Sequence, residues 1–288
     1  MQGGLSHPYR GLMLKILTRA FLLSVVSVTS IAHGLVHEQI NKITAQWDQN
    51  PDCDLLVKRG RLWLEDQNLK KAEEDFKRAI ECDGGNRNAL FHLSEQYLLE
   101  KNFPLAMKFN RMFLKGLNNE AGALKRGFEL RGQILLAQDK PSQAAQAFRA
   151  ALLHANPVEP ALIMEYVQAL KSPEAIKELD KWNQKIGPLL VLEQAALEYE
   201  EQLKHWSSAL KRTERIISQN PNNLRYQVKK INQLIALKSF EDAQLQLNVA
   251  RKAWASLPKT RQASKAVDQQ RRLLDSYQLI LSEMTTKP

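Results

Sequence analysis

The chain contains few of the residues that interrupt regular structure: only 12 glycines and 11 prolines occur among its 288 residues. Most of them fall where turns are expected, and strand patterns are almost absent. Glycine and proline are the strongest local signals of a turn or a linker. Their scarcity argues against a low-complexity linker in the central part of the chain and leaves helices as the expected element.

Signatures of catalysis are also missing. The sequence has no HExxH, CxxC or GxSxG motif and no glycine-rich phosphate loop. Its carboxylates alternate with lysines on the expected helix faces, which is typical of solvated surface. We therefore predict a protein that is not an enzyme and that binds no cofactor or metal. The six histidines are scattered: His7, His33, His37, His92, His154 and His205.

An alanine recurs along the chain, followed four residues later by a large apolar residue and then by a small or apolar one. The steps between these alanines are 34, 38, 31, 34 and 34 residues. A period near 34 residues predicts stacked helix pairs, and the alternative is an irregular helical bundle with accidental periodicity. The anchor alanines are Ala72, Ala106, Ala144, Ala175, Ala209 and Ala243.

The best unit covers residues 54–85 and reads as two amphipathic helices joined at the polar stretch DQN. Each half has apolar residues at i, i+3/4 and i+7, the spacing of one helix face. Small residues stand where the helices must approach closely, and aromatic residues fill the space beside them. The two sets are Leu56, Gly60 and Trp63, then Ala72, Phe76 and Ala79.

These residues resemble the tetratricopeptide repeat (TPR), over roughly residues 52–258 and best in the first three units. The resemblance implies an all-α, right-handed superhelical solenoid of antiparallel helix pairs. About six pairs are expected in residues 53–258, followed by a capping helix and tail in residues 259–288, because a terminal repeat needs a cover for its exposed apolar face. The second and third units match at Leu90, Leu93, Ser94, Tyr97, Ala106, Phe113, Phe128, Gly132, Leu135, Ala144, Phe148 and Ala151.

The same resemblance implies a noncatalytic adaptor or scaffold that binds a protein or peptide along the first helix of each pair. Phe91 is the expected anchor, as an exposed aromatic residue within a polar rim, and the adjacent His92 is expected to be a contact residue. The lysine–asparagine clamp of chaperone-binding TPR proteins is not matched, since Val57, Phe91 and Glu129 stand there. The expected groove residues are Arg61, Asn88, Phe91, His92, Glu95, Arg126, Glu129 and Gln133.

The N-terminus predicts a secretory signal peptide in residues 1–34, followed by a lead-in segment in residues 35–52. Three basic residues precede the apolar run AFLLSVVSVTSIA, which is too short for a comfortable membrane span. Small residues at Ala32 and Gly34 suit signal peptidase, and no cysteine near the cut offers a lipid anchor. A start at Met13 would give a leader of more ordinary length. An uncleaved anchor in the inner membrane, facing the periplasm, is the alternative.

Export would place the mature chain in the periplasm or outside the cell, so no nucleic-acid partner is expected. The net charge of +10 is uneven: residues 203–288 hold 16 lysines and arginines against 6 acidic residues. This asymmetry suggests an alternative function, that of an envelope-assembly or export accessory protein whose basic C-terminal third binds an anionic polymer or lipid surface. The alternative is a solvated basic face. The sequence indicates neither the partner nor the oligomeric state.

The two cysteines are candidates for a disulfide. Cys53 precedes the first helix of the first unit and Cys82 ends the second helix. Because the helices of a pair are antiparallel, both residues are expected at the same end of the hairpin, and an oxidising compartment would allow them to bond. The alternative is two unrelated free thiols. Neither cysteine has neighbours typical of a zinc site.

Overall fold

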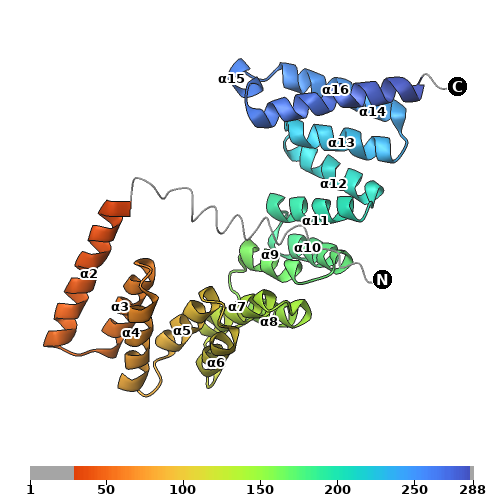
Figure 1. Cartoon of the computed structure of the whole chain (residues 1–288). Coiled ribbons are helices and arrows are strands. Elements are labelled where there is room, and N and C mark those ends of the chain that lie inside the picture. Colours follow the sequence, from red (N-terminus) through yellow and green to blue (C-terminus); the bar gives the residue numbers. More distant parts are fainter. Residues whose placement is uncertain (1–28, 286–288) are drawn as a thin grey trace, which may run out of the picture. The chain divides into compact units, whose positions relative to one another are not determined.

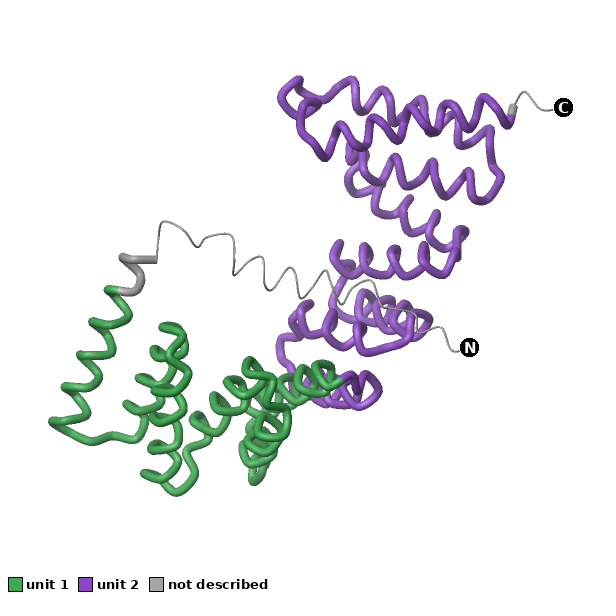
Figure 2. The backbone as a smooth tube through the Cα atoms, in the orientation of Figure 1, with its two compact units in different colours: residues 1–138 green, residues 139–288 purple. Residues whose placement is uncertain are grey.

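The computed structural model describes residues 29–285, so most of the expected signal peptide lies outside the described residues. Regular structure in this part consists of helices α2 to α16, and no strand occurs within it (Figure 1). This confirms the expected all-α fold. None of the described helices combines the length and the apolar character needed to cross a membrane. The chain divides into two compact units, with unit 1 ending at Gln138 and unit 2 beginning at Asp139 (Figure 2).

Unit 1 is built from consecutive helices that pack against their sequence neighbours. Contacts join α2 to α3, α3 to α4, α4 to α5, α5 to α6 and α6 to α7. The step of 38 residues between Ala106 and Ala144 is four longer than the usual 34, and residues 121–124, which we take as the extra four, form the first turn of α7. The helices are α2 (Thr29–Gln49), α3 (Cys53–Glu65), α4 (Leu69–Cys82), α5 (Arg87–Leu99), α6 (Phe103–Leu114) and α7 (Ala121–Ala137).

Unit 2 continues the pattern and ends in a long helix. That last helix, α16, packs on α13 and α14 and buries Leu274 and Leu281 against them (Figure 1). It begins at Lys265, because a short helix first turns the chain. The helices are α8 (Pro141–Leu153), α9 (Pro160–Gln168), α10 (Ser172–Ile186), α11 (Leu190–Gln202), α12 (Trp206–Gln219), α13 (Leu224–Ala236), α14 (Phe240–Ala255), α15 (Lys259–Gln262) and α16 (Lys265–Thr285).

The alanine register explains how neighbouring helices pack. All six anchor alanines are completely buried, which shows that the period found in the sequence is a period of core positions. In the first pair, Gly60 of α3 allows α3 and α4 to approach each other as closely as the buried alanines do. A Cβ atom at Gly60 would lie 2.6 Å from Cε1 of Phe76 on α4. The aromatic ring of α4 therefore occupies the space that a side chain would otherwise fill.

A left-handed residue ends the first helix of most pairs, five positions before the anchor alanine. The next residue donates its N–H back to the first helix, as Asn68 does to the carbonyl of Trp63 and Asn102 to that of Tyr97, both at 2.8 Å. This is the bond that closes a Schellman-type helix end. The left-handed residues have φ between 58° and 61° and are Gln67, Lys101, Asp139, Lys204 and Lys238.

Asparagine side chains begin three helices of unit 1. Asn68, Asn86 and Asn102 each accept a hydrogen bond from the backbone N–H three residues later. Such caps satisfy donors that have no partner within the helix, and each contributes about 1 kcal/mol. The α3–α4 and α5–α6 turns are therefore fixed at both ends, by a left-handed residue before the turn and a cap after it.

Candidate functional site

The expected groove residues of unit 1 lie on the first helices of their pairs. Four of them form a connected cluster on α5 and α7, which we call the Phe91 cluster: Phe91, His92, Glu95 and Arg126. His92 Nδ1 lies 2.8 Å from Glu95 Oε2, and the guanidinium of Arg126 lies over the Phe91 ring, 5.0 Å from its centre. Stacking of the His92 ring on Phe76 of α4, with centroids 5.6 Å apart, anchors the cluster to the core.

Phe91 is buried, and the expectation of an exposed anchor is wrong. Only 9% of the residue is accessible. Its ring packs against Phe113 of α6 at a centroid separation of 5.1 Å, and Arg126 covers another side. The helical period places Phe91 on the correct helix, but side chains from two other helices enclose it. The accessible group at this position is therefore the arginine above the ring.

The other expected groove residues differ in exposure. Arg61 on α3 and Asn88 on α5 are exposed, whereas Glu129 and Gln133 on α7 are half-buried. Glu129 also pairs with Lys125, one turn earlier, at 3.7 Å. The polar residues most accessible to a partner are therefore Arg61, Asn88 and Arg126.

Cys53 and Cys82 form a disulfide in the structure. Their Cα atoms are 5.8 Å apart, within the range that a disulfide requires. The bond ties the start of α3 to the end of α4, as expected for an antiparallel pair. Cys53 is half-buried and Cys82 is exposed.

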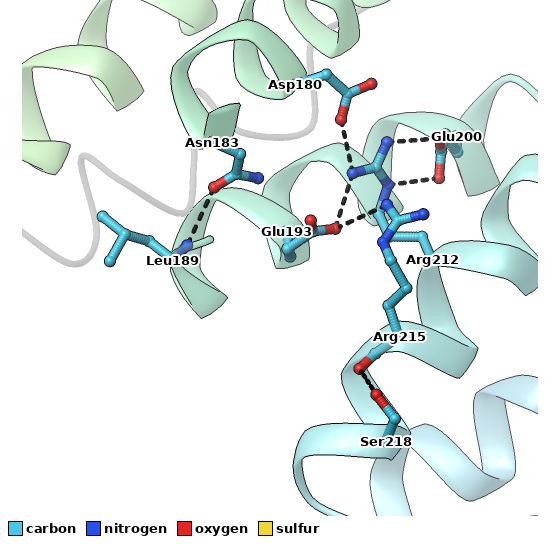
Figure 3. Close-up of polar contacts among 8 residues, drawn as sticks. All are labelled: Asp180, Asn183, Leu189, Glu193, Glu200, Arg212, Arg215 and Ser218. Carbon is cyan, nitrogen blue, oxygen red and sulfur yellow. Dashed lines mark hydrogen bonds and ion pairs between the residues drawn. The ribbon is translucent and has the colours of Figure 1, made fainter. Parts of the chain in front are cut away.

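A second polar site, in unit 2, was not expected from the sequence. Arg212 of α12 is only 3% exposed and is surrounded by three carboxylates (Figure 3). Glu200 of α11 accepts two hydrogen bonds from it, at 2.9 and 2.8 Å. Asp180 of α10 and Glu193 of α11 both accept from Nη1 at 2.8 Å. We call these four residues the Arg212 network; it links three consecutive helices.

The register of the repeats shows what this network replaces. Glu200 stands nine residues before its anchor alanine, Ala209. In the first two units the residues at that distance are Trp63 and Tyr97, which help to fill the space between helices. A carboxylate at an aromatic core position, with an arginine three residues after the anchor, is the sequence signal that could have revealed the network.

Charge balance keeps Arg212 ionised. Burial alone would lower the pKa of Arg212, but its hydrogen bonds to Glu200 and Asp180 outweigh that effect and raise the pKa above its usual value. A buried ion pair of this kind contributes little net stability, yet removing one partner leaves an uncompensated buried charge. The network therefore fixes the mutual positions of α10, α11 and α12.

A cavity of about 500 Å³ opens beside the Arg212 network. Its lining includes all four network residues together with Asn183, Lys211 and Arg215. Arg215 lies 3.3 Å from Glu193 and is 55% exposed. In the part of the chain that the structure describes, no three histidine, cysteine or acidic side chains are arranged to hold a metal ion.

Asn183 is a cavity residue with a buried polar atom that has no hydrogen-bond partner. Its Oδ1 accepts the backbone N–H of Leu189 at 3.1 Å, which fixes the orientation of the amide (Figure 3). Its Nδ2, on the other side of the amide, is buried and has no partner. A buried donor without an acceptor costs free energy, so this amide is a position at which the packing between α10 and α11 is not optimal for stability.

Comparison with known proteins supports the fold. No protein-family model matches the sequence, and no curated protein matches it. The C-terminal part of a TPR repeat-containing protein from Cytophaga hutchinsonii aligns with a TM-score of 0.53 and 15% identity, covering 69% of this chain and 79% of that one. A TPR protein from Parabacteroides merdae aligns with a TM-score of 0.49 and 14% identity, covering 85% and 94%. The first of these alignments shows that the chain is similar in fold to a solved TPR protein, as an α-solenoid of stacked helices.

Proposed function

We propose that the chain is a noncatalytic adaptor that binds a protein or peptide partner through the first helices of its repeats. Stacked helix pairs present extended surfaces of the kind that repeat proteins use for binding. The observation that carries the proposal is the Phe91 cluster, in which exposed Arg126 is held over a rigid aromatic base. Arginine is enriched among residues that dominate binding energy at interfaces.

The geometry at Arg126 explains why this residue is suited to the role. Arg126 lies over the Phe91 ring and the residue is exposed, so its N–H donors are available to a partner. A side chain already held in place loses less conformational entropy when it binds. Carboxylates and backbone carbonyls of an extended peptide are the natural acceptors for such a group.

A photo-crosslinking amino acid placed at position 126 tests the proposal in cells. We expect a crosslinked product from position 126 that is absent when the same group replaces Arg111, an exposed residue on α6, the second helix of its pair. Identical products from both positions, or none from position 126, would contradict partner binding on the first helices. The fold of each protein is checked by circular dichroism.

We further propose that the protein is exported to the cell envelope, most simply to the periplasm of a Gram-negative bacterium. The leader pattern in residues 1–34 and the Cys53–Cys82 disulfide support this location, because disulfides persist in oxidising compartments. N-terminal sequencing of protein from the envelope fraction is expected to begin near Leu35. Protein that retains residues 13–34 would instead support an inner-membrane anchor.

A second candidate function is binding to an anionic envelope surface. It is favoured by one observation: no acidic residue occurs in residues 243–267, while Lys252, Lys259, Arg261 and Lys265 are all exposed there. The side chain of Gln262 holds α15 against the end of α14 through the carbonyls of Trp254 and Leu257. These cations are therefore gathered at one end of the last helices.

Vesicle sedimentation tests this second function. The protein is expected to bind phosphatidylglycerol vesicles at low salt, to release them at high salt, and to ignore neutral vesicles. Replacing Lys259, Arg261 and Lys265 with glutamine should abolish binding. The matched control replaces three exposed lysines of unit 1, Lys58, Lys70 and Lys108. An equal loss of vesicle binding in both triple variants would show that binding depends on the net charge of the protein and not on the position of these three residues.

A further inference from the structure

The outer face of α14 carries two large apolar residues, a combination that the second helices of the other five pairs lack. Leu245 and Val249 stand two and six residues after the anchor Ala243 and are 65% and 49% exposed. They are one helical turn apart, so their side chains are neighbours on the surface. The repeat pattern does not account for this pair. At two residues after the anchor alanine, the other units have exposed polar residues, which are Glu74, Lys108, Gln146, Lys177 and Lys211.

Charges of opposite sign lie at equal distances on either side of the apolar pair. Exposed Asp242 lies three residues before Leu245, and exposed Lys252 lies three residues after it ends at Val249. Neither charged side chain has an ion-pair partner within the described residues. Glu241 adds a second acidic group in the first turn of α14. The helix dipole favours acidic residues in the first turn and basic residues in the last, but it does not explain the apolar residues between them.

This arrangement is complementary to itself. The four residues are separated by three, four and three positions, which is the spacing of a seam between two packed helices. When two α14 helices pack antiparallel about a two-fold axis midway along this seam, each Leu245 meets Val249 of the second copy. The same register brings each Asp242 to Lys252 of the second copy, and every favourable pair occurs twice. Parallel packing would instead place like charges opposite each other, which costs free energy.

We propose that the outer face of α14 is a self-association surface, through which two copies of the chain form an antiparallel, two-fold dimer. The centre of the contact is apolar, formed by Leu245 and Val249 of each copy. Its ends are closed by ion pairs between Asp242 of one copy and Lys252 of the other. Each chain contributes one helix to the seam, so the interface is small and the dimer is weak. The dimer presents the Phe91 cluster twice, which favours a partner with two binding segments.

Analytical ultracentrifugation of the purified protein tests for the dimer. We expect a monomer–dimer equilibrium that shifts toward the monomer on dilution. Leu245→Ser and Val249→Ser should each weaken association about tenfold, because each change removes apolar burial twice in a two-fold dimer. The matched controls are Leu99→Ser and Leu153→Ser, which change exposed leucines at the ends of α5 and α8 and should have no effect. Thermal unfolding confirms that each variant is folded.

Exchange of the two charges tests the antiparallel register. Asp242→Lys places lysines opposite each other, and Lys252→Asp places aspartates opposite each other, so each single variant should associate about fivefold more weakly. An equal mixture of the two variants should associate as the unchanged protein does, since each copy supplies the charge that the other lacks. The double variant Asp242→Lys, Lys252→Asp should also dimerise, because the antiparallel register restores both ion pairs.

The proposal is overturned if the protein remains monomeric at its highest soluble concentration, or if the serine variants associate as well as the unchanged protein. A double variant that associates no better than the single variants would also overturn it, because the register would then not be antiparallel. A monomer whose binding to phosphatidylglycerol vesicles falls on Leu245→Ser would assign this face to a lipid surface instead. None of these results affects the adaptor role of the Phe91 cluster, which is measured by crosslinking in unit 1.

Discussion

Arg59 and Asp75 form a two-point ion pair within the first helix pair: Nε lies 2.7 Å from Oδ2 and Nη2 lies 2.6 Å from Oδ1. Arg59 also donates to Thr44 Oγ1 of α2 at 3.1 Å. The hydrogen bonds that Arg59 donates to Asp75 are the main reason that the pKa of Arg59 is raised. A single side chain thereby joins α2, α3 and α4.

This pair leads to a prediction about stability. Asp75→Ala should lower the free energy of unfolding by about 3 kcal/mol, because it leaves a mostly buried guanidinium without its carboxylate. The double variant Arg59→Leu, Asp75→Leu should recover most of that loss. Urea unfolding measures both. A double variant that is less stable than Asp75→Ala would show that the pair itself contributes the stability.

Gly60 and Gly122 provide a matched pair of glycine-to-alanine changes. Gly60→Ala should lower stability by about 1–3 kcal/mol, because its Cβ would clash with Phe76. Gly122→Ala in the first turn of α7 should raise stability by about 0.5 kcal/mol, since nothing lies within 4 Å and alanine favours the helix. Thermal unfolding compares the two. Similar effects of both changes would contradict the close approach of α3 and α4.

Because Phe91 is buried, Phe91→Ala should lower the stability of the folded protein. Removal of a buried phenylalanine costs about 3 kcal/mol or more, and the loss should appear as a lower melting temperature. Phe91→Leu, which keeps an apolar side chain in the core, should cost far less. The two variants should also lose the fixed position of Arg126. An unchanged melting temperature in Phe91→Ala would contradict the burial of this side chain.

Reduction of the Cys53–Cys82 disulfide should lower the free energy of unfolding by about 3 kcal/mol, the chain-entropy estimate for a loop of this length. The variant Cys53→Ser, Cys82→Ser should behave like the reduced protein and should not respond to reductant. Thiol labelling before and after reduction measures the bond itself. Two reactive thiols in protein taken directly from the envelope would contradict the bond in the cell.

Stability should fall in acid because of Glu73. Its hydrogen bonds with Lys77 and then with Tyr97 lower the pKa of Glu73 in the folded protein. A carboxylate with a lowered folded pKa stabilises the protein above its unfolded pKa, near 4, and this contribution disappears as the pH falls through the folded value. Glu73→Gln should therefore show a shallower decline in stability below about pH 4. An identical decline would assign the effect to other groups.

The fold class could be predicted because the period of the sequence is also the period of the core. Every anchor alanine is buried, so counting residues was enough to identify stacked helices. Phe91 could not be placed in this way, since its exposure depends on Phe113 and Arg126, which come from other helices.

The Arg212 network could be predicted even less well than the position of Phe91, because its members are far apart in the sequence. Arg212 and Asp180 are 32 residues apart in the chain, and no periodic signal pairs them. What the sequence did contain was a misfit, a carboxylate at Glu200 where earlier units have Trp63 or Tyr97. Departures from a repeat pattern therefore mark the positions at which a repeat has acquired a property of its own.

The left-handed residues before the anchor alanines also make the helix pairs interchangeable. Gln67, Lys101, Lys204 and Lys238 end their helices with the same backbone geometry, though none of them is glycine. A segment cut between two such turns, such as α4–α5, carries matching ends, so its removal would join α3 to α6 through the same turn geometry. The pair α9–α10 is the exception, since Lys171 precedes α10 in an extended conformation. The turn between α9 and α10 therefore does not provide an end that matches those of the other turns.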